Sequence, residues 1–170
     1  MIYTMKRAQI VLMHPHEARE TARLIHDIIL NVPWLDEQDR LSQALAYSPE
    51  ALRHFISQHP TRVLIAKDRH YVVGFCLHTR ESDHYRLAWY GVHPDWRQHG
   101  IGSDLIGSFM HLMRAEWAGC VRHHCHLQNR VSYHILQSYG FQEVESPLPA
   151  WRGKDYHTLE RKIELTRITR

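Results

Sequence analysis

The chain has 170 residues, 44% of them hydrophobic and 23% charged, with a formal net charge of +3. This composition is typical of one globular domain, which we expect to span residues 1–170. The small charge, spread along the chain, argues against a nucleic-acid partner, and no apolar run approaches the roughly 18 residues of a membrane span.

The first part of the chain predicts one strand and then helices. Residues 8–14 form a short apolar run, and residues 15–32 carry apolar side chains at helical spacing. Residues 33–48 predict a loop that runs into a short helix. The next helix has a clear start signal, with Ser48 as N-cap and Pro49 in the first helical position.

From residue 61 onward the pattern changes to that of β-strands. Residues 61–68 and 71–80 are two β-rich runs joined by a short turn, which predicts a hairpin. Residues 85–94 form a third such run, which Pro94 stops.

A strongly amphipathic helix is predicted from Ile101 to Trp117, with Gly119 as its end. The strand that follows, at residues 121–128, should alternate between two faces, with Val121, His123, Cys125 and Leu127 on one and Arg122, His124, His126 and Gln128 on the other.

The rest of the chain predicts a second helix over residues 129–140, closed by Gly140, and two final strands at residues 141–146 and 155–165. The predicted fold class is α/β (α+β), with a single mixed, mostly antiparallel central sheet of six to seven strands flanked by about four helices. A parallel crossover is expected where the strand at 85–94, the amphipathic helix and the next strand follow one another.

The turn before the amphipathic helix has the sequence WRQHGIGS. The first amides of a helix lack intrahelical acceptors and lie at the positive end of its dipole. Gly100 and Gly102 would let a phosphate approach the backbone, and Arg97 could add charge-assisted hydrogen bonds. An anion site is therefore predicted here, in preference to a helix entry without a ligand.

Two common phosphate sites do not match. A Walker A loop requires Gly-Lys-Ser/Thr, whereas the turn has Gly-Ile-Gly-Ser. A dinucleotide fingerprint requires a third glycine where Leu105 stands, and an acidic residue about twenty positions later. No such residue occurs between Glu116 and Glu143.

The stretch YGVHPDWRQHGIGSDLI resembles the acetyl-CoA signature of the GCN5-related N-acetyltransferases (GNAT), whose turn is Gln/Arg-x-x-Gly-x-Gly/Ala. Arg97, Gly100 and Gly102 match that turn, and Val92 and Pro94 match the end of the preceding strand. The later stretch NRVSYHILQSYGF resembles the family's Asn-x-x-Ala…Gly-Phe segment, with matching positions Asn129, Ser132, Gly140 and Phe141. The order of elements from about residue 8 to 165 agrees as well.

The resemblance implies an N-acetyltransferase that transfers an acetyl group from acetyl-CoA, its cosubstrate, to a primary amine by direct attack. The Tyr90–Val92 backbone would pair with the pantetheine arm, and amides from Gln98 to Ser103 would hold the pyrophosphate. The amide of Val92 would polarise the thioester carbonyl. The implied coenzyme A contacts are Tyr90, Gly91, Val92, Arg97, Gln98, His99, Gly100, Ile101, Gly102, Ser103 and Asn129.

The proton donor departs from the family pattern. Many members carry a tyrosine seven residues after the asparagine, where this chain has Leu136. Tyr133 is the preferred substitute, Tyr139 is the alternative, and both could equally pack the helix against the sheet. The thiolate could also take its proton from water.

The general base is expected to be His124, five residues before Asn129, where some relatives carry an acid. His126, on the same face, comes next, and Glu81, Asp83 and His84 are weaker candidates. A purely structural role stays open for each of them.

The amine acceptor, a small molecule or a peptide, would meet residues 31–40, where Trp34 and Leu35 could form an apolar wall. Trp89 and Tyr90 could face the same pocket. Asp36 or Glu37 could attract a cationic amine, but Asp36, Glu37 and Asp39 are expected instead to be exposed loop residues. A homodimer is left open.

The sequence also offers two rival functions. A metal site at residues 123–126 is not expected. On a strand His123 and Cys125 lie on one face and His124 and His126 on the other, so at most two of them could bind one ion. A non-catalytic acyl-CoA sensor or interaction module remains the alternative to an enzyme. The three cysteines have no metal-like spacing and no secretory signal is visible, so we expect a cytoplasmic protein with free thiols.

Overall fold

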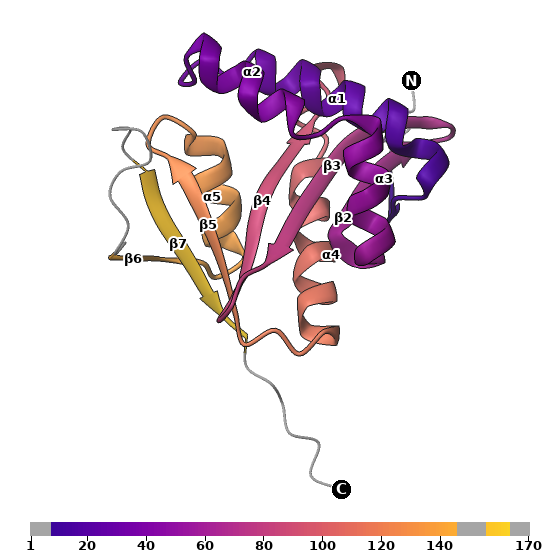
Figure 1. The fold of residues 1–170 in the computed structure, drawn as a ribbon. Helices are drawn as coiled ribbons and strands as arrows, with labels where there is room; N and C mark the ends of the chain where they lie inside the picture. The colour runs from indigo at the N-terminus through magenta and orange to yellow at the C-terminus, as the bar shows by residue number, and fades with distance from the viewer. Residues whose placement is uncertain (1–7, 146–155, 164–170) are drawn as a thin grey trace, which may run out of the picture. The chain divides into compact units, whose positions relative to one another are not determined.

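The computed structural model describes residues 8–145 and 156–163. Within this part of the chain, the strands are β1 (Gln9–Leu12), β2 (Val63–Asp68), β3 (Tyr71–Arg80), β4 (Tyr85–Val92), β5 (Cys120–His126), β6 (Gln142–Val144) and β7 (Tyr156–Lys162). The α-helices are α1 (Ala18–Leu30), α2 (Glu37–Leu45), α3 (Pro49–Gln58), α4 (Ile101–Ala115) and α5 (Arg130–Ser138) (Figure 1). Short 3-10 turns are η1 (Pro15–Glu17), η2 (Pro60–Arg62) and η3 (Pro94–Trp96).

Backbone hydrogen bonds order the strands β1-β2-β3-β4-β5-β7-β6 in one sheet. The pairs β1–β2, β2–β3, β5–β7 and β6–β7 are antiparallel, and β4–β5 is parallel. The predicted mixed sheet with its parallel crossover is confirmed. The described residues form five α-helices, and α2 is the short helix that was predicted within residues 33–48. The outer ends of the last two predicted strands, Ser146, Asp155, Glu164 and Leu165, lie outside the described residues.

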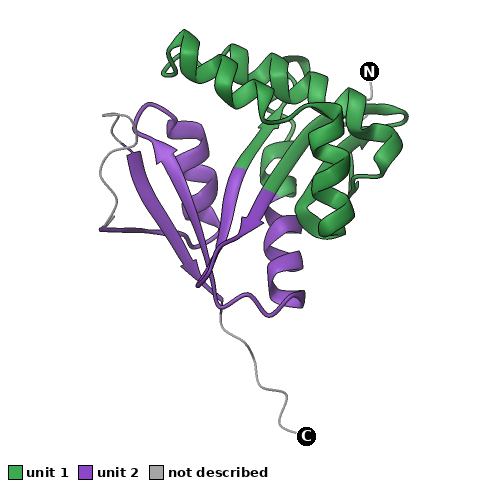
Figure 2. Ribbon diagram, in the orientation of Figure 1, with its two compact units in different colours: residues 1–77, 89–105 green, residues 78–88, 106–170 purple. Residues whose placement is uncertain are grey.

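The chain divides into two compact units, each considered by itself (Figure 2). Unit 1 takes residues 1–77 and 89–105, and it combines the antiparallel strands β1, β2 and most of β3 with α1, α2 and α3. Its core includes fully buried side chains from α1, α3, β2 and β3, namely Ile25, Ile29, Leu52, Ile65 and Phe75. Each such side chain stabilises the fold by about 2 kcal/mol through burial.

Two helices of unit 1 begin at side-chain caps. The predicted cap of α3 is confirmed, since the Ser48 hydroxyl accepts a hydrogen bond from the Ala51 amide at 3.1 Å. Asp36 is exposed, as expected, and has the same function at α2, where its carboxylate accepts from the Asp39 amide at 2.8 Å. Asp39 was expected to be exposed as well, but it is fully buried. Such caps typically stabilise a helix by about 1 kcal/mol.

Unit 2 takes residues 78–88 and 106–170, with β5, β6, β7, α5 and most of α4. The predicted alternation is confirmed within β5, because Val121, His123 and Cys125 are buried while the residues between them are partly exposed. Its predicted extension to Gln128 is wrong, since β5 ends at His126 and Leu127 is 44% exposed. Phe109 of α4, Leu136 of α5 and Leu159 of β7 are fully buried and complete this core.

The ends of the two unit 2 helices differ from each other. The prediction for α5 is confirmed, since Gly140 has φ of 78° and the Phe141 amide donates to the Leu136 carbonyl at 3.1 Å. The prediction that Gly119 ends α4 is wrong. Instead the helix ends at Ala115, and Trp117 makes the left-handed turn with φ of 56°.

Candidate functional site

The glycine turn of unit 1 joins β4 to α4. Two residues in this turn have left-handed backbone, Gln98 with φ of 63° and Gly100 with φ of 80°. The Asp104 amide donates to the Gly100 carbonyl at 2.9 Å, which begins the intrahelical hydrogen bonds of α4. The amides of Ile101 and Gly102 come before that bond, at the positive end of the helix dipole.

Gly100 has no protein atom in front of its missing side chain. A Cβ built on it would meet no heavy atom within 4 Å. Its positive φ also favours glycine, since a left-handed conformation costs other residues roughly 1–2 kcal/mol. The main chain is therefore accessible at Gly100, as a helix start that binds an anion requires.

Side chains of the turn fold back onto its backbone. The Nε of Arg97 donates to the Val92 carbonyl at 3.1 Å, which ties the turn to the end of β4. The Nδ1 of His99 lies 2.7 Å from the Arg97 carbonyl and must donate, because a carbonyl only accepts. Arg97 is exposed, so its terminal nitrogens lie where they could meet a phosphate.

The last residues of β4 are backed by α1. A Cβ on Gly91 would lie 2.9 Å from Cδ1 of Ile28 and 3.3 Å from the Phe75 ring. The close packing of α1 thus favours glycine at position 91, since a Cβ would force the Ile28 side chain to move, a reason that its position in the family motif did not suggest. Tyr90 and Val92, the other predicted pantetheine contacts, are half-buried.

The predicted acceptor residues also belong to unit 1. The indole Nε1 of Trp89 donates to the Gln43 side chain of α2 at 3.3 Å, a partner that the sequence gave no signal for. Trp34 is half-buried, whereas Leu35 is only 4% exposed and belongs to the core.

The expected base, His124, lies in unit 2. Its Nδ1 is hydrogen bonded to the Thr158 hydroxyl at 3.2 Å, because these two residues are directly opposite in the β5–β7 pair. Burial lowers the pKa of His124 below its ordinary value, and nearby Arg86, His84 and Arg122 lower it further. The imidazole is therefore neutral at pH 7 and can accept a proton.

The weaker base candidates are held in ion pairs. Asp83 bonds the His84 ring at 2.7 Å, and this contact holds the pKa of Asp83 below its usual value. Glu81 pairs with Arg86 at 3.2 Å. The remaining candidate, His126, lies edge-on to the Tyr156 ring.

Asn129 is the N-cap of α5, and its side-chain oxygen accepts from the Ser132 amide at 3.3 Å. The side-chain NH2 of Asn129 is thus the group that could donate to a ligand.

The two tyrosines of α5 have different surroundings. The Tyr133 hydroxyl donates to Glu143 at 3.3 Å, and Glu143 also bonds His157 at 2.6 Å. Desolvation and the Glu143 carboxylate raise the pKa of Tyr133. Tyr139 packs on α4, where a Cβ on Gly107 would come within 2.8 Å of its hydroxyl. Leu136, at the family's tyrosine position, is fully buried.

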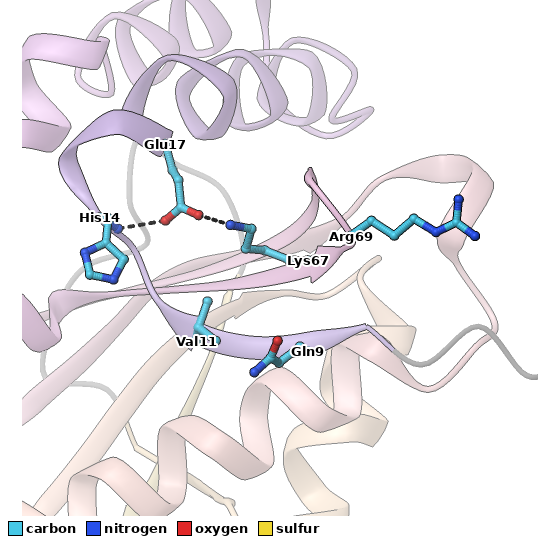
Figure 3. Close-up of a pocket in the computed structure, with 6 residues that line it drawn as sticks. All are labelled: Gln9, Val11, His14, Glu17, Lys67 and Arg69. Carbon is cyan, nitrogen blue, oxygen red and sulfur yellow. Dashed lines mark hydrogen bonds and ion pairs between the residues drawn. The ribbon is translucent and has the colours of Figure 1, made fainter.

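A separate hollow of unit 1, of about 430 Å³, lies beside β1 and β2 (Figure 3). Its lining residues are Gln9, Val11, His14, Glu17, Lys67 and Arg69. Glu17 is 5% exposed, bonds Lys67, and accepts from the His14 amide at 2.8 Å. Burial would raise the pKa of Glu17, but these hydrogen bonds hold it below its ordinary value. Glu17 thus neutralises the charge of Lys67.

Lys67→Met is expected to lower the free energy of unfolding by about 3 kcal/mol, because it leaves the Glu17 carboxylate buried without its cation. Urea unfolding at pH 7 measures this loss, and adding Glu17→Gln should restore most of it. The lowered pKa of Glu17 makes the ion pair stabilising above pH 4.5, so the difference from the parent should shrink as the pH falls further. Equal stability of parent and variant at pH 7 would contradict this account.

Two kinds of feature were not found in the described ranges 8–145 and 156–163. No group of three or more His, Cys, Asp or Glu side chains is arranged to hold a metal ion. No helix there combines the length and hydropathy needed to cross a bilayer.

Solved structures share this fold. The PaiA N-acetyltransferase of Thermoplasma acidophilum in complex with coenzyme A superposes with a TM-score of 0.75 at 18% identity, over 92% of this chain and 99% of that one. A GNAT-family acetyltransferase of Streptococcus pneumoniae gives 0.77 at 15% identity, over 93% and 100%. The putative acetyltransferase yncA of Salmonella typhimurium with its cofactor acetyl-CoA gives 0.68 at 18% identity, over 93% and 95%.

Sequence comparison gives the family. No match was found among curated proteins. The family model for the acetyltransferase (GNAT) family, however, matches residues 26–141, which is more than half of the 170 residues. The resemblance seen in the sequence is therefore confirmed, and the chain belongs to the GNAT acetyltransferase family.

Proposed function

We propose that this protein is a single-domain N-acetyltransferase that transfers the acetyl group of acetyl-CoA to a primary amine by direct attack. The observation that carries this proposal is the glycine turn before α4, where Gly100 leaves the backbone open beside the first amides of the helix. The family match supports the reaction class. Free Cys76, Cys120 and Cys125 agree with a cytoplasmic location, which is part of the proposal.

In the proposed complex, the turn and β4 hold coenzyme A. The backbone amides of residues 98–103 and the Arg97 guanidinium contact the pyrophosphate, and the backbone of Tyr90–Val92 pairs with the pantetheine arm. The side-chain NH2 of Asn129 adds a further contact, since its oxygen already caps α5. These contacts neutralise and orient the ligand without a metal ion.

In the proposed reaction, the amine nitrogen attacks the thioester carbonyl carbon. A C–N bond forms, the C–S bond breaks, and the Val92 amide stabilises the charge that develops on the carbonyl oxygen. The proton of the amine passes to Nε2 of His124, in the tautomer in which Nδ1 donates to Thr158. The leaving thiolate takes a proton from Tyr133, whose hydroxyl must first release Glu143, or from water.

The acceptor is proposed to be a small-molecule or peptide amine that meets the loop between α1 and α2. Trp34 and Trp89 are half-buried and offer apolar surface, while Leu35 is buried in the core. The apolar surface would contact the carbon skeleton of the acceptor.

The second candidate is a non-catalytic acyl-CoA sensor. Leu136 is fully buried where the family's proton donor stands, and Tyr133 is hydrogen bonded to Glu143, so no hydroxyl is already placed as an acid. Such a protein would bind acetyl-CoA and leave the thioester intact.

One experiment separates the two candidates. The purified protein is mixed with acetyl-CoA and a panel of polyamines, amino acids, aminoglycosides and peptides, and released thiol and acetylated amine are measured together. Equal amounts of both products support the enzyme. Calorimetric binding of acetyl-CoA without product across the panel would support the sensor, and no binding would contradict both.

A further inference from the structure

The parallel pairing of β4 with β5 is short. The registered pairs are Tyr85 with Val121 and Arg86 with Arg122, and among the described residues the register ends there. The next residues along the two strands are Leu87 and His123. β4 itself continues to Val92, so its last residues lie beyond the end of its registered pairing with β5.

A side chain of β5 makes a hydrogen bond to β4 at the position where the registered pairing ends. Nδ1 of His123 lies 2.8 Å from the carbonyl oxygen of Leu87. A carbonyl only accepts, so Nδ1 carries the proton and donates it. His123 is 7% exposed and Leu87 is 1% exposed, so the bond is shielded from water.

The buried imidazole is a permanent neutral donor. Burial lowers the pKa of His123 to about 4, so its neutral form persists through the physiological range. The ring supplies a donor to the Leu87 carbonyl, a buried acceptor at the point where the registered pairing of β4 with β5 ends.

We propose that His123 is a positioning residue for coenzyme A, fixing β4 at Leu87 and thereby the course of the strand through Tyr90–Val92. This inference rests on the proposed function, in which those backbone groups pair with the pantetheine arm. A histidine that merely filled the core would affect stability alone. A positioning histidine affects stability and ligand affinity together, and a side chain that keeps its donor can replace it.

The test compares three variants. His123→Leu removes the donor, whereas His123→Asn keeps one, because the amide nitrogen of asparagine occupies nearly the same place as Nδ1 of histidine. Val121→Ala is the matched control, since Val121 is fully buried on the same face of β5 and lowers stability through lost packing. Affinity for coenzyme A is measured by calorimetry, and hydrogen exchange is followed in the peptide that covers residues 87–92.

We expect His123→Leu to raise the Kd for coenzyme A about tenfold and to speed exchange in that peptide. His123→Asn and Val121→Ala should stay within about twofold of the parent in both measurements. If His123→Leu does not fold, His123→Met takes its place, since the flexible methionine side chain can fill the same space and also lacks a donor.

The inference is overturned if the donor-free variant binds like the parent, if His123→Asn loses as much affinity, or if Val121→Ala loses affinity equally. A parent protein that binds no coenzyme A would instead refute the proposed function. In that case hydrogen exchange still decides whether His123 fixes β4.

Discussion

Gly100→Asn is expected to weaken the binding of coenzyme A by about 100-fold, which corresponds to roughly 2.7 kcal/mol. A side chain at this position would project into the space where a Cβ meets no protein atom, which the pyrophosphate occupies in the proposed complex. Asparagine is chosen because it tolerates the left-handed region better than other side chains, and Gly100 has φ of 80°. The substitution therefore blocks the ligand with little backbone strain.

The measurement is calorimetric titration with coenzyme A, accompanied by thermal unfolding. Gly119→Asn is the control, because a Cβ on Gly119 also meets no atom within 4 Å but lies outside the turn. The control should bind coenzyme A like the parent, and both variants should unfold within a few degrees of it. Unchanged affinity in Gly100→Asn would remove the turn from the cofactor site.

The parts of the fold that the sequence predicted depend on residues close to one another along the chain. The cap at Ser48, the alternation along β5 and the left-handed Gly140 are each visible within a few positions. The end of α4 was not predicted, because no residue near it signals the turn. Trp117 takes a conformation that its own side chain disfavours, and a local pattern carries no sign of such a turn.

The candidate site shows the same difference between residues that are adjacent in the sequence and residues that only the fold brings together. The turn from Arg97 to Gly102 was predicted because the glycines and the helix start are adjacent in sequence. The partners of the proposed catalytic groups were not predicted. Thr158, for example, is 34 residues from His124 and contacts it only because β5 and β7 pair in this register. Composition and spacing do not specify that register, so the acid–base chemistry stayed less defined than the cofactor site.

His124→Ala is expected to lower kcat/KM for acetyl transfer about 100-fold, the usual effect of losing a general base. The base must be neutral to accept a proton, so the rate rises with pH through its pKa. Burial and the positive charges of Arg86 and Arg122 hold that pKa below the ordinary value of 6.5. The parent should therefore reach its plateau by neutral pH, with an acidic limb below 6.5 that the variant lacks.

Two further variants separate catalysis from structure, with kcat/KM measured between about pH 5 and 8, where histidine titrates. His124→Gln can keep a hydrogen bond to Thr158 but cannot accept the proton, so it should be as slow as His124→Ala. His126→Ala removes an imidazole that contacts Tyr156 instead, and it should keep the acidic limb. Full activity in His124→Gln would show that the hydrogen bond, not proton transfer, is what the reaction requires. The amine would then lose its proton to water, and His124 would only hold β5 against β7 through Thr158.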